Sequence, residues 1–531
     1  QSMLYDLLIK NGTVFDGSGG YARQDVGVKA GRIAEVGNFD FGDAERCVDA
    51  GGLAVAPGFI DVHTHSEIQA WKENFASAKP SQGITTELTG QCGLSAYPVS
   101  DESLDDVMRY VASGLGKMEE PWPWRDYASY REVVGKKGLS INQGTFIGHG
   151  TLRIDVMGFA DKRASPKELS DMGSLLRKEL ADGALGLSSG LVYAPGVFSD
   201  AEEMVELAKA CAECGAAYTT HMRNEAGSVL EAVDEALNVA LRSGVKLVIS
   251  HMKATGSPNH GKSVQMLAKQ AAAREKGARV YGDCYPYDAS STMMTIVLPP
   301  WTLSRGISGM LEILADGGER GKIKENFLNG IEGWENRSKT LGWENMIVAS
   351  VSTEKNKEAE GLDLVEFGKR RGKEPADVMM DLLLEEHGEV TAVLKGMSDE
   401  DVKTFLKDPN VMVCSDGIPV GGKPHPRLHG AIARYLCRYA DMSCEKGIAA
   451  AVHKLTGLPA DIYGLSEIGR IKKGYMADIT IFDPSKVEDK ADFQNPFRIS
   501  EGIEHVFVGG VSVYENKALG GNRPGRFIRR T

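Results

Sequence analysis

Residues 53–65 read LAVAPGFIDVHTH, and this segment is the most informative one about the fold of the chain. The apolar run from Leu53 to Ile60 predicts a buried strand. Two histidines follow with one residue between them, and side chains at positions i and i+2 of a strand point to the same side. His63 and His65 can therefore reach one ion beyond the C-terminal end of the strand. In a (β/α)8 barrel, that end of the strands carries the chemistry.

The middle of the chain alternates strand and helix signals. Its apolar runs predict eight strands, namely Leu53–Asp61, Ile84–Thr89, Asn142–Gly148, Ala184–Ser188, Ala216–Thr220, Lys246–Ser250, Arg279–Asp283 and Asn410–Ser415. Helical patterns such as Ala201–Cys214, Ser228–Ser243 and Ser263–Lys276 fall between them. Eight strands with intervening helices are typical of a closed (β/α)8, or TIM-type, barrel in the α/β class.

Both ends of the chain show a different sequence pattern from the middle. Residues 3–56 and 466–531 contain short runs of alternating polarity, broken by glycine and aspartate, which predict antiparallel strands. We expect one small β-domain built from both ends, with the catalytic barrel occupying residues 57–465. Residues 300–345 carry no clear strand signal, which predicts a helical insertion on the catalytic side of the barrel.

The composition argues against several classes of protein. The chain has 531 residues, of which 42% are hydrophobic and 25% are charged, as in an ordinary globular protein. A net charge of −12 argues against a nucleic-acid partner. The sequence contains no run of about 18 uncharged apolar residues, so it predicts no membrane span. Since no secretory signal is evident, we expect a cytoplasmic protein whose eight cysteines are reduced thiols.

Several predicted strands end at, or just before, a residue type that binds metals. These residues are His63 and His65, Cys92, His221, His251 and Asp416. The C-terminal ends of barrel strands face one mouth, so we expect these side chains to converge there. Cysteine and histidine suit zinc, and a site with three protein ligands leaves a position for water. Asp416 is the natural general base, because a neighbouring cation keeps it ionised.

Several motifs together resemble a known family. PGFIDVHTH at residues 57–65 is similar to the opening signature of the amidohydrolase superfamily. The segments that resemble its D-aminoacylase branch, the N-acyl-D-amino-acid deacylases, are GQCG at 90–93, GHGTLR at 148–153, HMRNE at 221–225, YPY at 285–287 and HPRL at 425–428. GYMAD at 474–478 is similar to the family's return into the β-domain. The resemblance covers nearly the whole chain.

The resemblance implies a zinc site with one tight position. Its three ligands would be Cys92, His221 and His251, where the cysteine replaces the carboxylated lysine or glutamate that bridges two metals in relatives. A second position, weak or empty, would be formed by His63, His65 and Asp416. Asp416 would take a proton from the attacking water and return it to the leaving amine. The segment LGLSSG at 185–190 has no lysine to carboxylate, which agrees with this.

A substrate that carries a carboxylate needs cationic partners. Lys253 and Arg427 follow metal-type residues in the sequence and suit this role, since such side chains bind carboxylates. The resemblance assigns both cations to the carboxylate of an N-acyl amino acid, with Tyr285 and Ser291 beside them. It assigns Tyr193 to the acyl or carbonyl side.

The activity implied by the resemblance is zinc-dependent hydrolysis of N-acyl-D-amino acids to a carboxylate and a free D-amino acid. Two related activities stay open. One is cleavage of dipeptides with a C-terminal D-residue, and the other is hydrolysis of cyclic amides, as in dihydroorotase or hydantoinase relatives. A non-catalytic barrel is a further alternative, but the retention of every ligand-type residue argues against it. The substrate would be a small molecule, and the sequence indicates no oligomeric state.

A nucleotide-binding protein is the alternative from a different class. GSPNHGKS at residues 256–263 matches the phosphate-loop pattern, and a predicted helix follows it. A phosphate loop leaves its strand directly, so that backbone N–H groups face the phosphates. Here the strand ends near His251, and Pro258 removes one donor from the loop. Both features argue against a nucleotide site.

Overall fold

Parallel strands form the centre of the computed structural model, which describes residues 5–39, 44–72 and 78–530. The strand order is β6-β7-β8 in one sheet and β9-β10-β11-β12-β13-β17 in another. These strands are β6 (Phe59–Asp61), β7 (Ile84–Thr89), β8 (Asn142–Thr145), β9 (Ile147–Gly148), β10 (Gly186–Gly190), β11 (Ala217–His221), β12 (Lys246–Ile249), β13 (Val280–Cys284) and β17 (Val411–Val413).

The two sheets meet at two seams. On one side β8 runs on into β9, and the Leu185 N–H donates to the Thr145 carbonyl at 2.8 Å. On the other side the Asp416 N–H donates to the His63 carbonyl at 2.8 Å, and the residues beside them, Thr64 and Gly417, form a parallel bridge. With β8 and β9 taken as one strand, eight parallel strands form a ring within the described residues. The predicted (β/α)8 fold class is confirmed.

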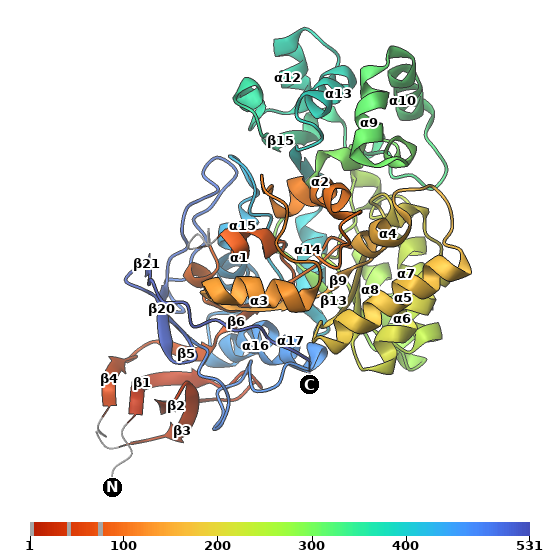
Figure 1. Ribbon diagram of the computed structural model, residues 1–531. Helices are drawn as coiled ribbons and strands as arrows, with labels where there is room; N and C mark the ends of the chain where they lie inside the picture. Colours follow the sequence, from red (N-terminus) through yellow and green to blue (C-terminus); the bar gives the residue numbers. More distant parts are fainter. Residues whose placement is uncertain (1–4, 40–43, 73–77, 531) are drawn as a thin grey trace.

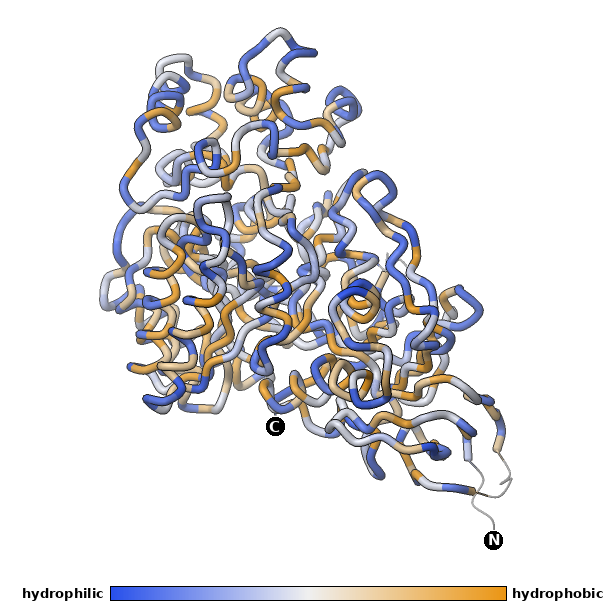
Figure 2. The backbone as a smooth tube through the Cα atoms, turned by 180° about the vertical axis from the view of Figure 1, so that it is seen from behind, coloured by the Kyte–Doolittle hydropathy of each residue, from blue (hydrophilic) through white to orange (hydrophobic). Residues whose placement is uncertain are grey.

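Helices surround this ring and its mouth. They are α1 (Glu67–Lys72), α2 (Leu104–Leu115), α3 (Tyr127–Lys137), α4 (His149–Met157), α5 (Pro166–Ala181), α6 (Ala201–Glu213), α7 (Val229–Ser243), α8 (Ser263–Glu275), α14 (Asp399–Lys407), α15 (Arg427–Arg434), α16 (Glu445–Leu455) and α17 (Gly457–Tyr463). Hydrophobic and hydrophilic segments alternate along them in Figure 2, as expected for helices with one buried face. None of the helices in the described ranges is long and apolar enough to cross a membrane.

A mixed sheet joins the two ends of the chain. Its strands are β1 (Tyr5–Phe15), β2 (Tyr21–Lys29), β3 (Arg32–Gly37), β4 (Ala44–Asp49) and β5 (Ala54–Pro57) from the N-terminal part, and β18 (Ile479–Phe482), β19 (Ile503–Val508), β20 (Val511–Glu515) and β21 (Ala518–Leu519) from the C-terminal part. β5 and β18 are the antiparallel neighbours that connect the two parts. In Figure 1 the red N-terminal strands lie beside the dark-blue β20. The expected domain boundaries, after residues 56 and 465, fall near the end of β5 and ahead of β18.

The segment Leu53–Asp61 forms two strands, so the prediction of a single strand there is wrong. β5 pairs with β1 and β18 in the sheet of the chain ends, whereas β6 pairs with β7 in the barrel. Gly58 lies between them at a very close approach, because a Cβ at this position would lie 1.9 Å from Thr85 Oγ1. The apolar pattern runs across the junction without a break because every residue of both strands is buried.

An insertion, which we define as residues 289–395, stands over the barrel at the top of Figure 1. The predicted segment 300–345 contains the helices α9 (Gly306–Ala315), α10 (Gly317–Asn329) and α11 (Arg337–Thr340). The insertion extends beyond it with α12 (Leu364–Arg371) and α13 (Pro375–Glu385). It also has an antiparallel sheet, in the order β14 (Ala289–Met293), β16 (Thr391–Lys395) and β15 (Met346–Ser350), which the sequence pattern did not predict.

The GSPNHGKS segment binds a carboxylate of its own chain. The Gly261 N–H donates to Asp401 Oδ2 at 2.9 Å, and the Ser263 hydroxyl donates to the same carboxylate. Lys262 Nζ donates to Asn259 Oδ1 at 2.7 Å. Asp401 therefore takes the place that a phosphate would need before the N-terminus of α8, in line with the argument against a nucleotide site.

Candidate functional site

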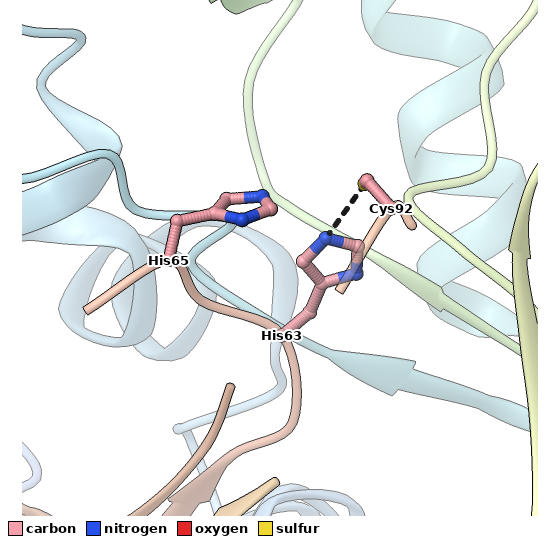
Figure 3. A group of neighbouring side chains, drawn as sticks. All are labelled: His63, His65 and Cys92. Atoms are coloured by element: carbon pink, nitrogen blue, oxygen red, sulfur yellow. Dashed lines mark hydrogen bonds between the residues drawn. The ribbon is translucent and has the colours of Figure 1, made fainter. Parts of the chain in front are cut away.

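The residues predicted as metal ligands meet at the C-terminal mouth of the barrel. His63 and His65 follow β6, and Cys92 follows β7 (Figure 3). Cys92 Sγ lies 3.3 Å from His63 Nε2 and 3.4 Å from His251 Nε2. His221, the last residue of β11, packs edge-on against His251 with ring centroids 4.4 Å apart. All five side chains are buried.

The spacing and chemistry of these donors fit zinc. Ligand atoms within 4.8 Å of one another are offered by three overlapping groups, namely His63, His65 and Cys92; Cys92, His221 and His251; and His63, His251 and Asp416. Tetrahedral zinc with Zn–S near 2.3 Å and Zn–N near 2.0 Å separates sulfur from nitrogen by about 3.5 Å. The distances from Cys92 are close to that value. His221 Nδ1 is buried without a hydrogen-bond partner in the described chain, which suits a ligand atom.

Three of the site residues have left-handed backbone conformations. The φ angles are 57° for Cys92, 31° for His251 and 47° for Asp416. Non-glycine residues in this region cost of order 1–3 kcal/mol, so the surroundings must hold them. The Asp416 N–H donates to the His63 carbonyl at 2.8 Å, and the His251 N–H donates to Asp283 Oδ1 at 2.6 Å. These sharp turns after the strands point the side chains into the mouth.

Asp416 contacts two histidines and one arginine. Its Oδ1 lies 3.3 Å from His63 Nε2 and 3.1 Å from His65 Nε2, and its Oδ2 lies 3.0 Å from Arg427 Nη1. Burial opposes ionisation, but Arg427 and the two histidines hold the pKa of Asp416 well below its usual value. The carboxyl group is therefore ionised, as a general base must be.

The thiol and the imidazoles at the mouth favour each other's charged forms. Burial opposes the thiolate, but His63 and His251 hold the pKa of Cys92 well below its usual value. Burial also opposes the imidazolium, yet the Cys92 thiolate, Asp283 and Asp416 hold the pKa of His63 well above its usual value. A dication can replace the imidazole protons in such a cluster, because metal binding releases protons from its ligands.

Glu225 is one carboxylate of the site that sequence reasoning missed. Its Oε1 lies 2.8 Å from His221 Nε2, and its Oε2 lies 3.2 Å from His251 Nδ1 and 3.2 Å from Lys253 Nζ. Carboxylates behind ligand histidines fix the orientation of the rings. The signal was present in the HMRNE motif, where Glu225 follows a strand-end histidine by four residues.

Asp283 is a second missed carboxylate. It lies near the end of β13, where its Oδ1 accepts the His251 N–H and its Oδ2 lies 3.5 Å from His63 Nδ1. The thiol of Cys414 donates to Oδ1 at 3.3 Å. Asp283 closes a predicted strand, so the rule that identified the other strand-end residues applies to it as well.

Lys79 is a buried cation that ties two strand ends together. Its Nζ contacts the carboxylate of Asp61 and donates to Thr64 Oγ1 at 2.8 Å and to Ser415 Oγ at 3.2 Å. The Ser415 N–H also donates to Asp61, at 2.9 Å. This network joins the ends of β6 and β17 through Thr64 and Ser415, which are chain neighbours of His63, His65 and Asp416. No sequence motif indicated it.

A cavity opens beside the metal-ligand cluster, and we call it the reaction cavity. Its lining includes His65, Cys92, His221, His251 and Asp416. Of the predicted substrate-binding residues, Lys253, Ser291 and Tyr193 line it. The Tyr193 hydroxyl lies 2.6 Å from Thr292 Oγ1, and its ring centroid is 5.0 Å from that of His221.

The other two predicted substrate-binding residues lie behind this lining. The guanidinium of Arg427 lies over the ring of Tyr285, 4.5 Å from the centroid. Arg427 also donates from Nη2 to the Ser291 carbonyl at 2.9 Å. Neither Arg427 nor Tyr285 is among the described residues that line the reaction cavity.

Known proteins resemble this chain over its whole length. A family model described as "Amidohydrolase family" matches residues 46–300 and 310–514. The D-aminoacylase of Alcaligenes xylosoxydans xylosoxydans is 32% identical over 531 residues, which cover 100% of this chain and 99% of that protein. The N-acyl-D-glutamate deacylase of the same organism is 34% identical over 526 residues, with 99% and 96% covered. The crystal structure of N-acyl-D-glutamate deacylase from Bordetella bronchiseptica, complexed with zinc and a phosphonate inhibitor, matches with a TM-score of 0.85 and 32% identity, covering 99% of this chain and 100% of that chain.

Proposed function

The chain belongs to the amidohydrolase family, and on that premise we propose that it hydrolyses the amide bond of N-acyl-D-amino acids, giving a carboxylate and a free D-amino acid. The observation that carries this proposal is the meeting of a thiolate–imidazole cluster and an ionised carboxylate, that of Asp416, in one cavity. The names of the relatives, D-aminoacylase and N-acyl-D-glutamate deacylase, support the substrate class.

We assign one tight zinc position to Cys92, His221 and His251. The second, weaker position is assigned to His63, His65 and Asp416. The soft thiolate and the unpaired Nδ1 of His221 support the first assignment. A zinc ion supplies polarisation of the amide carbonyl and activation of a water molecule.

Asp416 moves the proton in this mechanism. It begins ionised, because Arg427 and the histidines stabilise its negative charge. It accepts a proton from the attacking water as the water adds to the carbonyl carbon. It then donates that proton to the leaving nitrogen, so that the C–N bond breaks to give a neutral amine.

Lys253, Arg427, Tyr285 and Ser291 are assigned to the substrate carboxylate. Lys253 stays charged, because Glu225 raises its pKa despite burial, and it lines the reaction cavity. Arg427 and Tyr285 support this subsite from behind Ser291. Tyr193 is assigned to the acyl carbonyl side, next to His221.

Amine release from a substrate panel tests the proposal. The panel holds N-acetyl amino acids in D and L forms and dipeptides that end in D- or L-residues. Cyclic amides such as hydantoins are tested beside it, with ring opening followed by chromatography, because their hydrolysis frees no amine. We expect release from the N-acetyl D forms and none from their L counterparts. An Asp416→Asn protein purified in the same way controls for a contaminating hydrolase. Hydrolysis of cyclic amides alone, or equal release from L forms, would show that the proposal is wrong.

A further inference from the structure

A second cavity adjoins the reaction cavity, and we call it the apolar chamber. Its apolar lining includes Val192, Ala194, Leu298, Leu303, Ile307 and Trp334. The two cavities share Tyr193, Met293, Ile296 and Arg337, so they lie on either side of the same side chains. A group of the substrate that passes between these side chains leaves the polar site for an apolar one.

An outer groove adjoins the apolar chamber. Arg109 of α2 and Ile307 of α9 line both this chamber and an outer groove between α2 and α9. Arg109 is exposed, and its Nη1 donates to Ser308 Oγ of α9 at 3.4 Å. The reaction cavity, the chamber and the groove thus follow one another from Cys92 to the rim of the insertion. Arg109 and Ile307, which line both, stand between the chamber and the groove.

The charge at the junction of the two cavities is neutralised within the protein. Arg337 Nη2 lies 3.2 Å from Glu335 Oε1, and Arg337 Nη1 donates to the Ile296 carbonyl at 3.3 Å. The other Glu335 oxygen accepts the Glu225 N–H at 3.0 Å. Because Arg337 is paired, the passage does not favour an acidic group over an apolar one.

The position of the substrate carboxylate decides which group faces the chamber. Lys253 and Ser291 line the reaction cavity and do not appear among the described residues that line the chamber. Tyr193, on the acyl side, stands between the two. With the amino-acid part held at Lys253, the acyl part of the scissile amide extends past Tyr193.

We propose that the apolar chamber binds the acyl group, and that this enzyme acts on N-acyl-D-amino acids with unbranched alkanoyl chains longer than acetyl. This inference rests on the proposed function and narrows its substrate class. Each additional methylene that leaves water should raise kcat/KM by about fourfold. The gain should stop once the alkanoyl chain has filled the chamber.

A chain-length series tests the inference. The substrates are acetyl, butyryl, hexanoyl, octanoyl and dodecanoyl derivatives of the D-amino acid that the first panel identifies as best. We expect kcat/KM to rise from acetyl to octanoyl. If acetyl derivatives are hydrolysed but the profile is flat or falls, this inference is wrong while the proposed function stands. If no N-acyl-D-amino acid is hydrolysed, both are wrong.

A chamber variant identifies the group that occupies it. Ser113 of α2 lines the chamber, so Ser113→Phe should lower the octanoyl-to-acetyl ratio of kcat/KM at least tenfold. Asp106→Phe, on the exposed side of the same helix, should leave the ratio unchanged. A matched series of N-acetyl derivatives of D-alanine, D-norvaline and D-norleucine varies the side chain instead. If Ser113→Phe alters this series and not the acyl series, the chamber holds the side chain and the acyl assignment is wrong. If the variant does not fold, as judged by circular dichroism, the wild-type series decides.

Discussion

The residues at the mouth are held by their neighbours against their own backbone preferences. Cys92, His251 and Asp416 all have positive φ angles without being glycine. Asparagine and aspartate tolerate this conformation better than most residues do. A change from aspartate to asparagine at position 416 therefore alters the charge and leaves the backbone nearly undisturbed.

Asp416→Asn should lower kcat by about 10²- to 10⁴-fold, because an amide cannot accept the proton. The tight zinc should stay bound, since none of its three assigned ligands is changed. The measurements are kcat on the best substrate, zinc content by elemental analysis and the unfolding temperature. Turnover near the wild-type rate would refute the role assigned to Asp416.

Cys92→Ser should weaken zinc binding by roughly a hundredfold or more, since even residues behind the ligands contribute ten- to hundredfold. The zinc content after dialysis should then fall toward zero and activity should fall with it. Cys47→Ser is the matched control, because Cys47 is exposed on β4, away from the barrel mouth. If the Cys92 variant kept its full zinc content, Cys92 would not be a ligand of the tight zinc.

Contacts between elements also place ionisable groups in unusual surroundings. Glu179, in the last turn of α5, accepts the N–H of Tyr127 at the start of α3 at 2.8 Å. Burial raises the pKa of Glu179 to about 7. In the unfolded chain the pKa is about 4.3. The folded state therefore binds this proton more tightly, and its stabilising effect is present below about pH 4.3 and lost as the pH rises to about 7.

Glu179→Gln should remove this pH dependence. Between pH 5 and pH 8, the free energy of unfolding of the variant relative to wild type should rise by about 2–3 kcal/mol. Both proteins carry the same metal ligands, so the pH dependence of the metal site cancels in the comparison. Urea unfolding at the two pH values measures the difference, with Glu206→Gln on the exposed side of α6 as control. An equal difference at both pH values would contradict the raised pKa.

Over the whole molecule, the assigned metal ligands bring together segments more than 300 residues apart, from His63 to Asp416. Once the metal is gone, imidazole protons and Arg427 compensate the buried charges of Cys92 and Asp416. A ligand that binds only the folded chain stabilises it by mass action. Metal therefore connects the stability of the barrel to its activity.

Removal of zinc by a chelator should lower the unfolding temperature by several degrees and abolish activity. One equivalent of zinc per chain should restore both, because we assign one tight position. Scanning calorimetry and activity during a zinc titration measure these effects. If activity appeared only with the second equivalent, the assignment of one tight and one weak position would be wrong.

Local patterns were enough to predict much of this molecule. The alternation of apolar strands and amphipathic helices indicated the barrel, because burial and periodicity act within a few residues of the chain. The strand-end rule then selected Cys92, His221, His251 and Asp416, since all parallel strands of a barrel end at one mouth. The same rule applied to Asp283 would have found one of the missed carboxylates.

Packing between distant segments accounts for the features that local sequence patterns did not predict. The apolar pattern of Leu53–Asp61 is continuous, but pairing with distant strands divides the segment between two sheets at Gly58, which packs closely against Thr85. The antiparallel sheet of the insertion pairs β14 with β16 across about a hundred residues, a separation at which local periodicity carries no information. The contacts of Lys79, the pairing of Arg337 with Glu335 and the apolar chamber have the same origin. Each depends on which side chains meet in space, and that is set by the packed chain as a whole.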